Sequence, residues 1–374
     1  MKDSLKYEIA VTLVKGFGNK LVKNLIAYVG SPEAIFRESE RGLSRIPGIG
    51  QVLSSGFMAQ REEVLARAEK EIEFINKNGI SCYYYLDDDY PYRLKECADA
   101  PVVFFSKGTL DLNEGKFIGV VGTRKPTDTG RENVRMMIED IARSLPDVMV
   151  VSGLAYGIDI CAHRASLDFG LPTVGVLGHG LDRIYPGVHR QDARRMCCEA
   201  GGLVTEFLSG TNPDKPNFVK RNRIIAGLCD ALVVVESSSK GGALITADMA
   251  NDYNRDVFAF PGRVKDEFSV GCNRLIKQNK AMLIESADDV LHAMNWTVRE
   301  EKPREATSGN LFEDLSEEEN VVLTELCKYT DGIHVNELAA LLSMPFSRVS
   351  SLLLAMEFRN IVKCYPGNVY RAVR

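Results

Sequence analysis

The stretch KFIGVVG, residues 116–122, decides the fold class of this chain. It is a short apolar run that ends in glycine, and amphipathic stretches such as RENVRMMIEDIARSL (131–145) separate most of the similar runs that follow it. Apolar strands that alternate with helices indicate a mostly parallel sheet covered on both faces. We therefore predict an α/β core, doubly wound and Rossmann-like, over residues 79–297. The six further runs are VMVVSG (148–153), PTVGVLG (172–178), GLVTEF (202–207), ALVVVES (231–237), DVFAFPG (256–262) and AMLIES (281–286).

A helical pattern precedes this core, over residues 1–78, and contains two short apolar-glycine turns, GFG (16–18) and RIPGIGQ (45–51). The second turn fits a helix-hairpin-helix, in which backbone N–H groups at the start of the next helix can hold a phosphate. It fits equally well a tight turn in a small helical domain, since glycine allows positive φ there. Both interpretations stay open.

Two further segments follow the core. Residues 298–313 are charged and poor in apolar residues, which predicts a linker. Residues 314–374 contain three helical patterns and two short strands around Pro366-Gly367-Asn368, which predict a winged helix. Spacings typical of capping boxes predict helix starts at Thr129 with Glu132, Ser286 with Asp289, and Ser316 with Glu319.

Composition predicts an ordinary soluble, cytoplasmic protein. The 374 residues are 45% hydrophobic and 26% charged, with a formal net charge of −5. No apolar run approaches the ~18 residues of a membrane span, and the start lacks the pattern of a signal peptide. The nine cysteines contain no C-x-x-C pair and the five histidines show no ligand spacing, so we predict neither a disulfide framework nor a metal site.

The loops after the predicted strands carry the groups that could bind a ligand, since ligands of open parallel sheets bind beyond the carboxyl ends of the strands. These loops are rich in Gly, Ser, Thr, Arg and Lys and poor in carboxylates, which favours phosphate binding. They contain neither the dinucleotide-binding nor the P-loop pattern, and no catalytic triad or paired carboxylate singles out a reaction. The candidates are Gly122, Thr123 and Arg124, then Ser152 and Gly153, then Gly241 and Gly242.

One loop, Pro213–Arg223, is the most informative. It holds four cations around a single aromatic residue, Phe218, with one carboxylate, Asp214. Cations interleaved with an aromatic ring are typical of single-stranded nucleic-acid binding, in which phosphates pair with the cations and a base stacks on the ring. The alternative is a solvated helix start with Phe218 in the core, although cations at a helix N-terminus oppose its dipole. The four cations are Lys215, Lys220, Arg221 and Arg223.

The predicted winged helix has an unexpected charge. Residues 314–374 contain six Lys or Arg and eight Asp or Glu, a net charge of −2. Duplex-binding domains of this shape usually present a basic face. Weak duplex binding through Arg348 and Arg359 and a protein-contact or regulatory role both stay open.

Seven motifs in order closely resemble the DNA-processing protein A family, also called DprA or Smf. The resemblance is strong over about residues 80–290, and the helical N-terminal (SAM-like) and C-terminal segments match longer members of the family. It implies an extended Rossmann core and a non-enzymatic, cofactor-free single-stranded DNA binder that dimerises and helps load the RecA recombinase in natural transformation. The motifs are VVGTR, SGLAYGIDICAH, GHGLDRIYP, FVKRNRIIAGL, VVVESSSKGGALITA, VFAFPG and GCNRLIKQ.

The resemblance also implies site residues. The glycine-hydroxyl-arginine turn of the family matches Gly122, Thr123 and Arg124, with threonine in place of the usual serine, and the serine of the next loop matches Ser152. A lysine and a phenylalanine three residues apart match Lys215 and Phe218. The R-N-R motif matches Arg221, Asn222 and Arg223, and Gly241 and Gly242 match a loop whose first residue departs from the family pattern.

Two other functions are alternatives. The glycine-rich loops are similar to those of phosphoribohydrolase-like Rossmann enzymes, but Lys240–Ala247 lacks their catalytic glutamate. A role as an adaptor through the winged helix is the other alternative. Arg221 and Arg223 could contact DNA or pair as scaffold with carboxylates such as Glu206 or Glu236.

Overall fold

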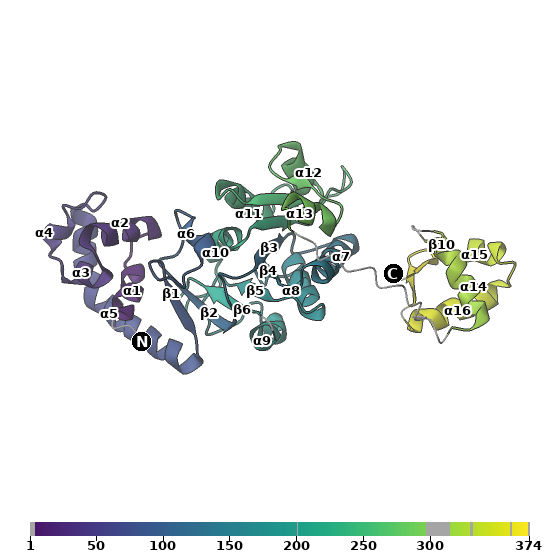
Figure 1. Ribbon diagram of the computed structural model, residues 1–374, viewed down its shortest axis with the longest axis horizontal. Helices are drawn as coiled ribbons and strands as arrows, with labels where there is room; N and C mark the ends of the chain where they lie inside the picture. Colours follow the sequence, from purple (N-terminus) through teal and green to yellow (C-terminus); the bar gives the residue numbers. More distant parts are fainter. Residues whose placement is uncertain (1–3, 200, 297–314, 330–331, 360, 373–374) are drawn as a thin grey trace. The chain divides into compact units, whose positions relative to one another are not determined.

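The computed structural model describes residues 4–199, 201–296, 315–329, 332–359 and 361–372. Residues 1–300 form one compact unit and residues 301–374 a second. Figure 1 labels their helices and strands. The predicted linker, 298–313, lies outside the described residues.

A nine-stranded sheet forms the centre of the first unit. Its order is β1-β2-β6-β5-β4-β3-β7-β8-β9. The seven strands from β3 to β9 are parallel to one another, whereas β2 runs antiparallel to both β1 and β6. The predicted doubly wound, mostly parallel sheet is therefore confirmed. The strands are β1 (Ser81–Tyr84), β2 (Val103–Thr109), β3 (Lys116–Val121), β4 (Val148–Ser152), β5 (Thr173–Val176), β6 (Gly201–Thr205), β7 (Ala231–Val234), β8 (Asp256–Ala259) and β9 (Met282–Leu283).

Helices cover both faces of the parallel part, as its uniformly apolar strands require. Side chains of α7, α8 and α13 pack on one face in a core that includes Ile118 and Val120, and α9 joins α8 in an adjoining cluster. Side chains of α6, α10, α11 and α12 pack on the other face. These helices are α6 (Tyr92–Lys95), α7 (Asp128–Ser144), α8 (Ile158–Asp168), α9 (Arg190–Cys198), α10 (Lys215–Leu228), α11 (Gly242–Asp252), α12 (Val270–Lys277) and α13 (Ala287–Ala293).

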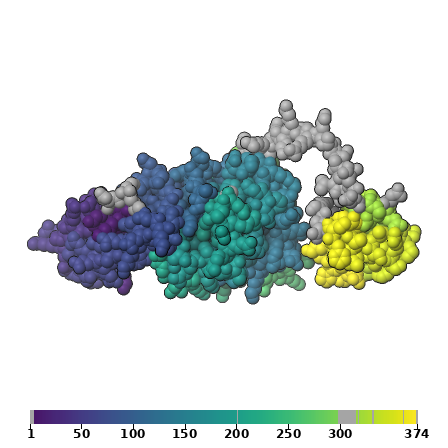
Figure 2. Space-filling view, turned by 90° about the horizontal axis from the view of Figure 1, so that it is seen from below, coloured from purple at the N-terminus to yellow at the C-terminus, as the bar shows by residue number. Residues whose placement is uncertain are grey.

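The N-terminal segment is helical, as predicted, and it shares a core with the edge of the sheet. Ile9, Phe36 and Phe57 belong to the same apolar cluster as Val103 and Phe105 of β2. Figure 2 shows the surface continuing without a break from these helices to the sheet region. The expected domain boundary after residue 78 coincides with the end of α5 and stays a prediction. The helices are α1 (Leu5–Leu13), α2 (Asn19–Val29), α3 (Pro32–Arg37), α4 (Glu40–Leu43) and α5 (Gln51–Asn78).

The predicted helix caps are correct at two of three places. Ser286 with Asp289 and Ser316 with Glu319 both form capping boxes. The prediction at Thr129 is wrong, because α7 begins two residues earlier: the Thr127 hydroxyl accepts a hydrogen bond from the Gly130 N–H at 3.0 Å. The sequence offers two threonines two residues apart, and the connection from β3 brings the first one to the helix start.

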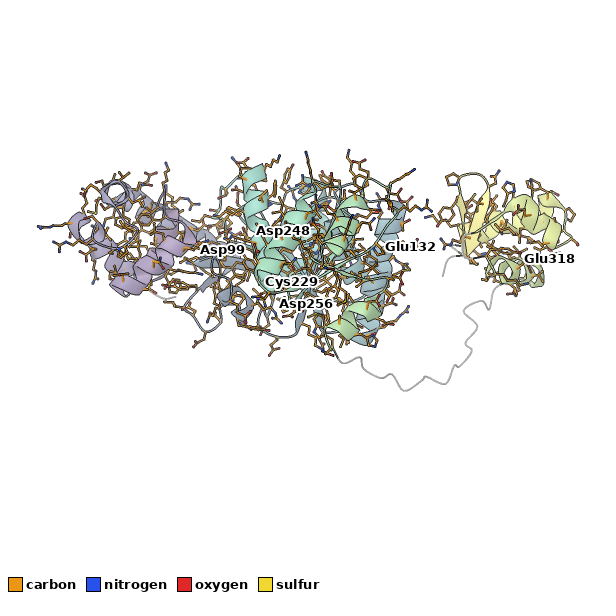
Figure 3. All side chains as sticks on the ribbon, turned by 90° about the horizontal axis from the view of Figure 1, so that it is seen from above. Asp99, Glu132, Cys229, Asp248, Asp256 and Glu318 are labelled. Carbon is orange, nitrogen blue, oxygen red and sulfur yellow. The ribbon has the colours of Figure 1, made fainter. Side chains whose placement is uncertain are left out.

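The second unit contains the three helices and the hairpin that the sequence predicts. Its antiparallel sheet has the order β10-β12-β11, and its helices close an apolar core that includes Leu338 and Leu353. Arg348 pairs with Glu318, which Figure 3 labels, and Arg359 pairs with Glu319. Both arginines considered for duplex binding therefore face carboxylates. The elements are α14 (Glu317–Leu326), β10 (Ile333–His334), α15 (Val335–Leu341), α16 (Phe346–Phe358), β11 (Val362–Tyr365) and β12 (Val369–Ala372).

No single helix in the described ranges is long and apolar enough to cross a membrane, and one pair, Val335–Leu341 with Phe346–Phe358, passes the same length and composition test together across a 115° bend.

Candidate nucleic-acid interface

The predicted glycine-rich turns meet at the carboxyl edge of the sheet. β3 and β7 are neighbours, and the chain leaves them toward opposite sides of the sheet, which is the place where doubly wound folds bind ligands. The N–H of Thr123, after β3, donates a hydrogen bond to the backbone oxygen of Glu236, after β7, at 2.7 Å. This bond joins the two loops, so Gly122–Arg124 and Gly241–Gly242 lie on one rim.

The turn after β3 is fixed by backbone contacts that leave Arg124 outside. The Ile158 N–H donates to the Thr123 oxygen at 3.1 Å, and the Lys125 N–H donates to the Thr123 hydroxyl at 3.2 Å. Gly157 has a φ of +81°, and a Cβ there would lie 2.2 Å from the Thr123 oxygen, so only glycine fits. The Thr123 hydroxyl thus holds the turn, while the Arg124 side chain is exposed.

The start of α10 brings Phe218 to this rim. The helix begins at Lys215, which is exposed, and the Phe218 ring lies half-buried beside Gly178 after β5. The Arg124 guanidinium carbon lies 5.8 Å from the centroid of the Phe218 ring. Residues from the loops after β3, β5 and β6 therefore converge on one aromatic ring.

The cations at this rim differ in whether they have a partner. Within the described part of the chain, Arg124 and Lys215 have no carboxylate within ion-pair distance. The Lys220 Nζ lies 3.6 Å from Glu206 and 5.4 Å from the centroid of the Phe207 ring. Arg124 and Lys215 are thus charges that the protein itself leaves uncompensated, which is the property that a phosphate site requires.

Arg221 and Arg223 lie inside the protein, at 3% and 6% exposure. Arg221 donates hydrogen bonds to the backbone oxygens of Gly153 (2.6 Å) and Val176. Burial lowers the pKa of Arg221 to about 10, against the opposing effect of the Asp159 carboxylate, whose own pKa burial raises. The guanidinium therefore joins the ends of β4 and β5 from beneath and does not reach a ligand on the rim.

Arg223 has a comparable scaffold role. It pairs with Glu206, as the sequence allowed, and donates to the backbone oxygen of Asp99 at 2.6 Å. Asp99 also accepts a 2.6 Å hydrogen bond from the Tyr253 hydroxyl, and Figure 3 labels it where the N-terminal helices meet the core. Asn222, between the two arginines, is half-buried on α10.

Ser152 and Gly153 do not face the rim, contrary to their selection as phosphate ligands. The Ser152 side chain is buried and donates to the Val120 oxygen at 2.6 Å. A Cβ at Gly153 would lie 2.1 Å from the Arg221 guanidinium. Ser152 and Gly153 both allow β4 to pack closely against β3 and Arg221, so their effect on a ligand is indirect.

Gly241 and Gly242 open α11 at the rim. A Cβ at Gly241 would lie 2.2 Å from the Ser237 hydroxyl, whereas Gly242 is exposed and has open space around its Cα. Backbone N–H groups at this 11-residue helix start are available to an anion in principle. Gly241, where this chain departs from the family pattern, therefore contributes backbone groups to the rim and no side chain.

A buried histidine supports the loop after β4. The single hydroxyl proton of Thr173 is donated to the Val150 oxygen at 2.9 Å, so His163 Nδ1 must donate to the Thr173 oxygen, at 2.7 Å. His163 Nε2 is then the acceptor of the Leu154 N–H, at 3.3 Å. Burial lowers the pKa of His163 to about 3, so the ring stays neutral and holds the loop that precedes α8.

The Glu236 carboxylate, after β7, is occupied by hydrogen bonds from Thr127. Its two carboxylate oxygens accept from the Thr127 N–H at 2.9 Å and from the Thr127 hydroxyl. It therefore fixes the start of α7. Across the described residues, no group of three or more His, Cys, Asp or Glu side chains could hold a metal ion.

One exposed aromatic residue on the rim was missed from the sequence. Tyr185, in the loop after β5, stacks on Phe218 with ring centroids 5.7 Å apart and an interplanar angle of 28°. The motif GHGLDRIYP contains it, and its place after a predicted strand was the available signal. The sequence could not show that this loop reaches the ring of Phe218.

The fold and the rim together define an α/β protein that presents unpaired cations and aromatic rings at the carboxyl edge of a parallel sheet. The family model described as DNA recombination-mediator protein A matches residues 81–295. The chain belongs to this family, which the sequence motifs had indicated.

Relatives and solved structures agree with that assignment. Protein Smf of Synechocystis sp. is 36% identical over 295 residues, covering 77% of this chain and 72% of the relative. DNA processing protein DprA of Streptococcus pneumoniae is 42% identical over 209 residues, covering 55% of this chain and 71% of the relative. The X-ray structure of the S. pneumoniae protein matches with a TM-score of 0.67 at 34% identity, over 78% of this chain and 98% of that one. A structure of DNA processing protein A from Helicobacter pylori, described for its single-stranded DNA binding mode, matches with a TM-score of 0.52 at 23% identity, over 58% of this chain and 95% of that one.

Proposed function

We propose that this protein binds single-stranded DNA on the rim formed by Arg124, Lys215 and Phe218. The observation that carries the proposal is the Arg124 guanidinium, without a carboxylate partner among the described residues, 5.8 Å from the centroid of the half-buried Phe218 ring, on a helix that begins with the exposed Lys215. Arg124 and Lys215 pair with phosphates, Phe218 stacks a base, and the open helix start at Gly242 adds backbone N–H groups. Lys220 contributes a weaker charge, because Glu206 lies 3.6 Å away.

The buried residues of the predicted site affect DNA binding indirectly, because they determine the shape of the rim. Arg221, Arg223 and Ser152 hold strands and loops in place, and Gly122, Gly153 and Gly241 allow the close packing that this requires. Thr123 fixes the turn that carries Arg124. In this assignment the R-N-R motif is mainly scaffold.

In the cell, we propose a cytoplasmic recombination mediator without enzymatic activity. It protects single-stranded DNA, acts as a homodimer and helps load the RecA recombinase, with natural transformation as the process served. Membership of the DNA recombination-mediator protein A family supports this role. Glu236 accepts two hydrogen bonds from Thr127, the N-cap of α7, and this use of the carboxylate argues against a hydrolase at the same rim.

The test is a salt-titrated comparison of oligo-dT binding, by fluorescence anisotropy, between the full chain and its double variant Lys215→Ala, Phe218→Ala. Loss of the base stack should weaken binding by ~1–3 kcal/mol. Loss of one phosphate contact should reduce the slope of log K against log salt by ~0.7. Lys77→Ala, an exposed lysine at the end of α5, is the matched control. Unchanged affinity in the double variant would show that the site lies elsewhere.

Duplex DNA and mononucleotides complete the experiment. A site built from one ring and separated cations should prefer single strands over a duplex, whose bases are not free to stack on Phe218. A mononucleotide should bind far more weakly than the oligonucleotide, since it engages one phosphate. Equal binding of mononucleotide and oligo-dT would instead indicate a nucleotide pocket.

A further inference from the structure

Tyr185 is an exposed aromatic residue on the proposed DNA rim. It lies in the loop after β5 and is 48% exposed. Part of its ring packs on Phe218, at 5.7 Å between centroids and 28° between planes. The ring thus continues the aromatic surface of Phe218 toward solvent, on a rim that also carries Arg124.

The loop that carries Tyr185 is anchored to the loop after β6. The Asp182 carboxylate accepts a hydrogen bond from the Gly210 N–H at 3.0 Å, and Arg183 donates to the Asn212 side chain at 2.9 Å. On its other side, the His189 N–H donates to the Pro186 oxygen at 3.1 Å. The loop is therefore held in place before a ligand arrives, and its tyrosine ring packs on Phe218, which reduces the entropy lost on binding.

The two rings differ in how much of their surface a ligand can reach. Phe218 is packed beside Gly178, where a Cβ would lie 2.7 Å from its ring, and Arg124 lies 5.8 Å from its centroid. Tyr185 keeps about half of its surface open. Single-strand binding proteins hold successive bases on successive aromatic side chains, because every base has a face that can stack.

We propose that Tyr185 is a second base-stacking platform, which receives the base next to the one on Phe218. This inference rests on the proposed single-stranded DNA site. It makes the stacked unit two consecutive bases rather than one. The arrangement is sequence-tolerant, since it uses ring faces and not hydrogen bonds to base edges.

The first experiment compares the full-length wild-type chain with Tyr185→Leu on two ligands of equal length. One is oligo-dT, and the other is an oligonucleotide of abasic sugar-phosphate units, which has the phosphates but no bases. Leucine preserves apolar contact with Phe218 but removes the aromatic face. We expect about five- to a hundred-fold weaker binding of oligo-dT, and equal binding of the abasic ligand.

The matched controls are Tyr185→Phe and Tyr28→Leu. The first keeps the aromatic face and should bind oligo-dT like the wild type. The second removes a 65% exposed tyrosine from α2, away from the rim, and should bind both ligands like the wild type. Together they separate the loss of a stacking face from the loss of a hydroxyl or of any exposed tyrosine.

A fluorescence reporter tests the stacking directly. The chain has a single tryptophan, Trp296, which is buried, so a Trp296→Phe, Tyr185→Trp double variant carries one tryptophan, at the proposed platform. Oligo-dT should quench its emission by stacking, and the abasic ligand should not. Equal responses to both ligands would contradict a stacking role.

The outcomes separate this inference from the function on which it rests. If the wild type binds no single-stranded DNA, the proposed function fails first. If the wild type binds and Tyr185→Leu binds equally well, or loses affinity for the abasic ligand to the same extent, the function stands and Tyr185 is not a stacking platform. Loss confined to the ligand with bases supports the inference.

Discussion

A substitution at Arg221 tests most directly whether the R-N-R motif supports the fold or contacts DNA. Replacing it with methionine keeps a long apolar side chain but removes both hydrogen bonds, to the oxygens of Gly153 and Val176. It also leaves the buried Asp159 carboxylate without its cation. We expect the first unit to lose stability, because buried groups after β4, on β5 and on α8 lose their partner at once.

The size of the effect follows from this geometry. Removing one partner of a buried charge pair costs ~3–5 kcal/mol. With about 2–4 °C of melting temperature per kcal/mol for domains of 150–250 residues, the expected drop is about 6–20 °C. Lys220→Met is the matched control. The Lys220 side chain is 54% exposed, and a surface substitution usually changes the free energy of unfolding by no more than ~0.5 kcal/mol.

The measurement is urea and thermal unfolding of the full chain, followed by oligo-dT binding at a temperature where the variant is folded. The scaffold role predicts a large stability loss for Arg221→Met, with the salt slope of binding unchanged in the folded protein. Wild-type stability combined with a salt slope reduced by ~0.7 would refute the reasoning and make Arg221 a phosphate ligand.

Three further predictions follow. Gly178→Ala should displace Phe218, because the added Cβ would lie 2.7 Å from its ring, and should weaken oligo-dT binding with little change in salt slope; unchanged affinity would mean that the ring is not used. Acid should destabilise the first unit through His163, whose folded pKa of about 3 lies below its ordinary 6.5. Below pH 6.5 the unfolded chain binds a proton that the folded chain excludes. Stability is therefore full above about pH 6.5, and the free energy of unfolding falls by up to ~1.4 kcal/mol per pH unit below it. His163→Gln should reduce this dependence, as measured by urea unfolding at several pH values. Deletion of residues 299–374 should leave oligo-dT affinity intact, and a lost affinity would favour a DNA or adaptor role for the C-terminal unit.

Much of the fold was readable from local sequence. The seven apolar runs all form strands, because strands buried on both faces of a parallel sheet must be apolar throughout. The antiparallel strands β1 and β2 were missed. β2 pairs with β1 and also with β6, and β6 lies far along the chain, so no local pattern reveals that pairing.

The candidate site was less predictable. Arg221 shares helical spacing with the buried Ile224, Ile225 and Leu228, so its burial had a signal in the sequence, although its charge pointed to the surface. Ser152 had no such signal, because its hydroxyl is used by an adjacent strand 32 residues earlier in the chain. Tyr185 was missed because its role depends on contact with Phe218, which lies on α10, after a different strand.

The sequence by itself determined the parallel strands and the helices between them, the glycine turns at the strand ends and the concentration of cations in the first turns of α10, since these follow from periodicity and composition over short stretches. Only the tertiary structure decided which of those cations stay free. The packing of α10 on the sheet buries Arg221 and Arg223 against backbone oxygens and Glu206, whereas Lys215 at the start of the same helix is exposed and Arg124 lies beside the Phe218 ring. A charge is available to a ligand when the fold leaves it unpaired, and that depends on neighbours distant in sequence.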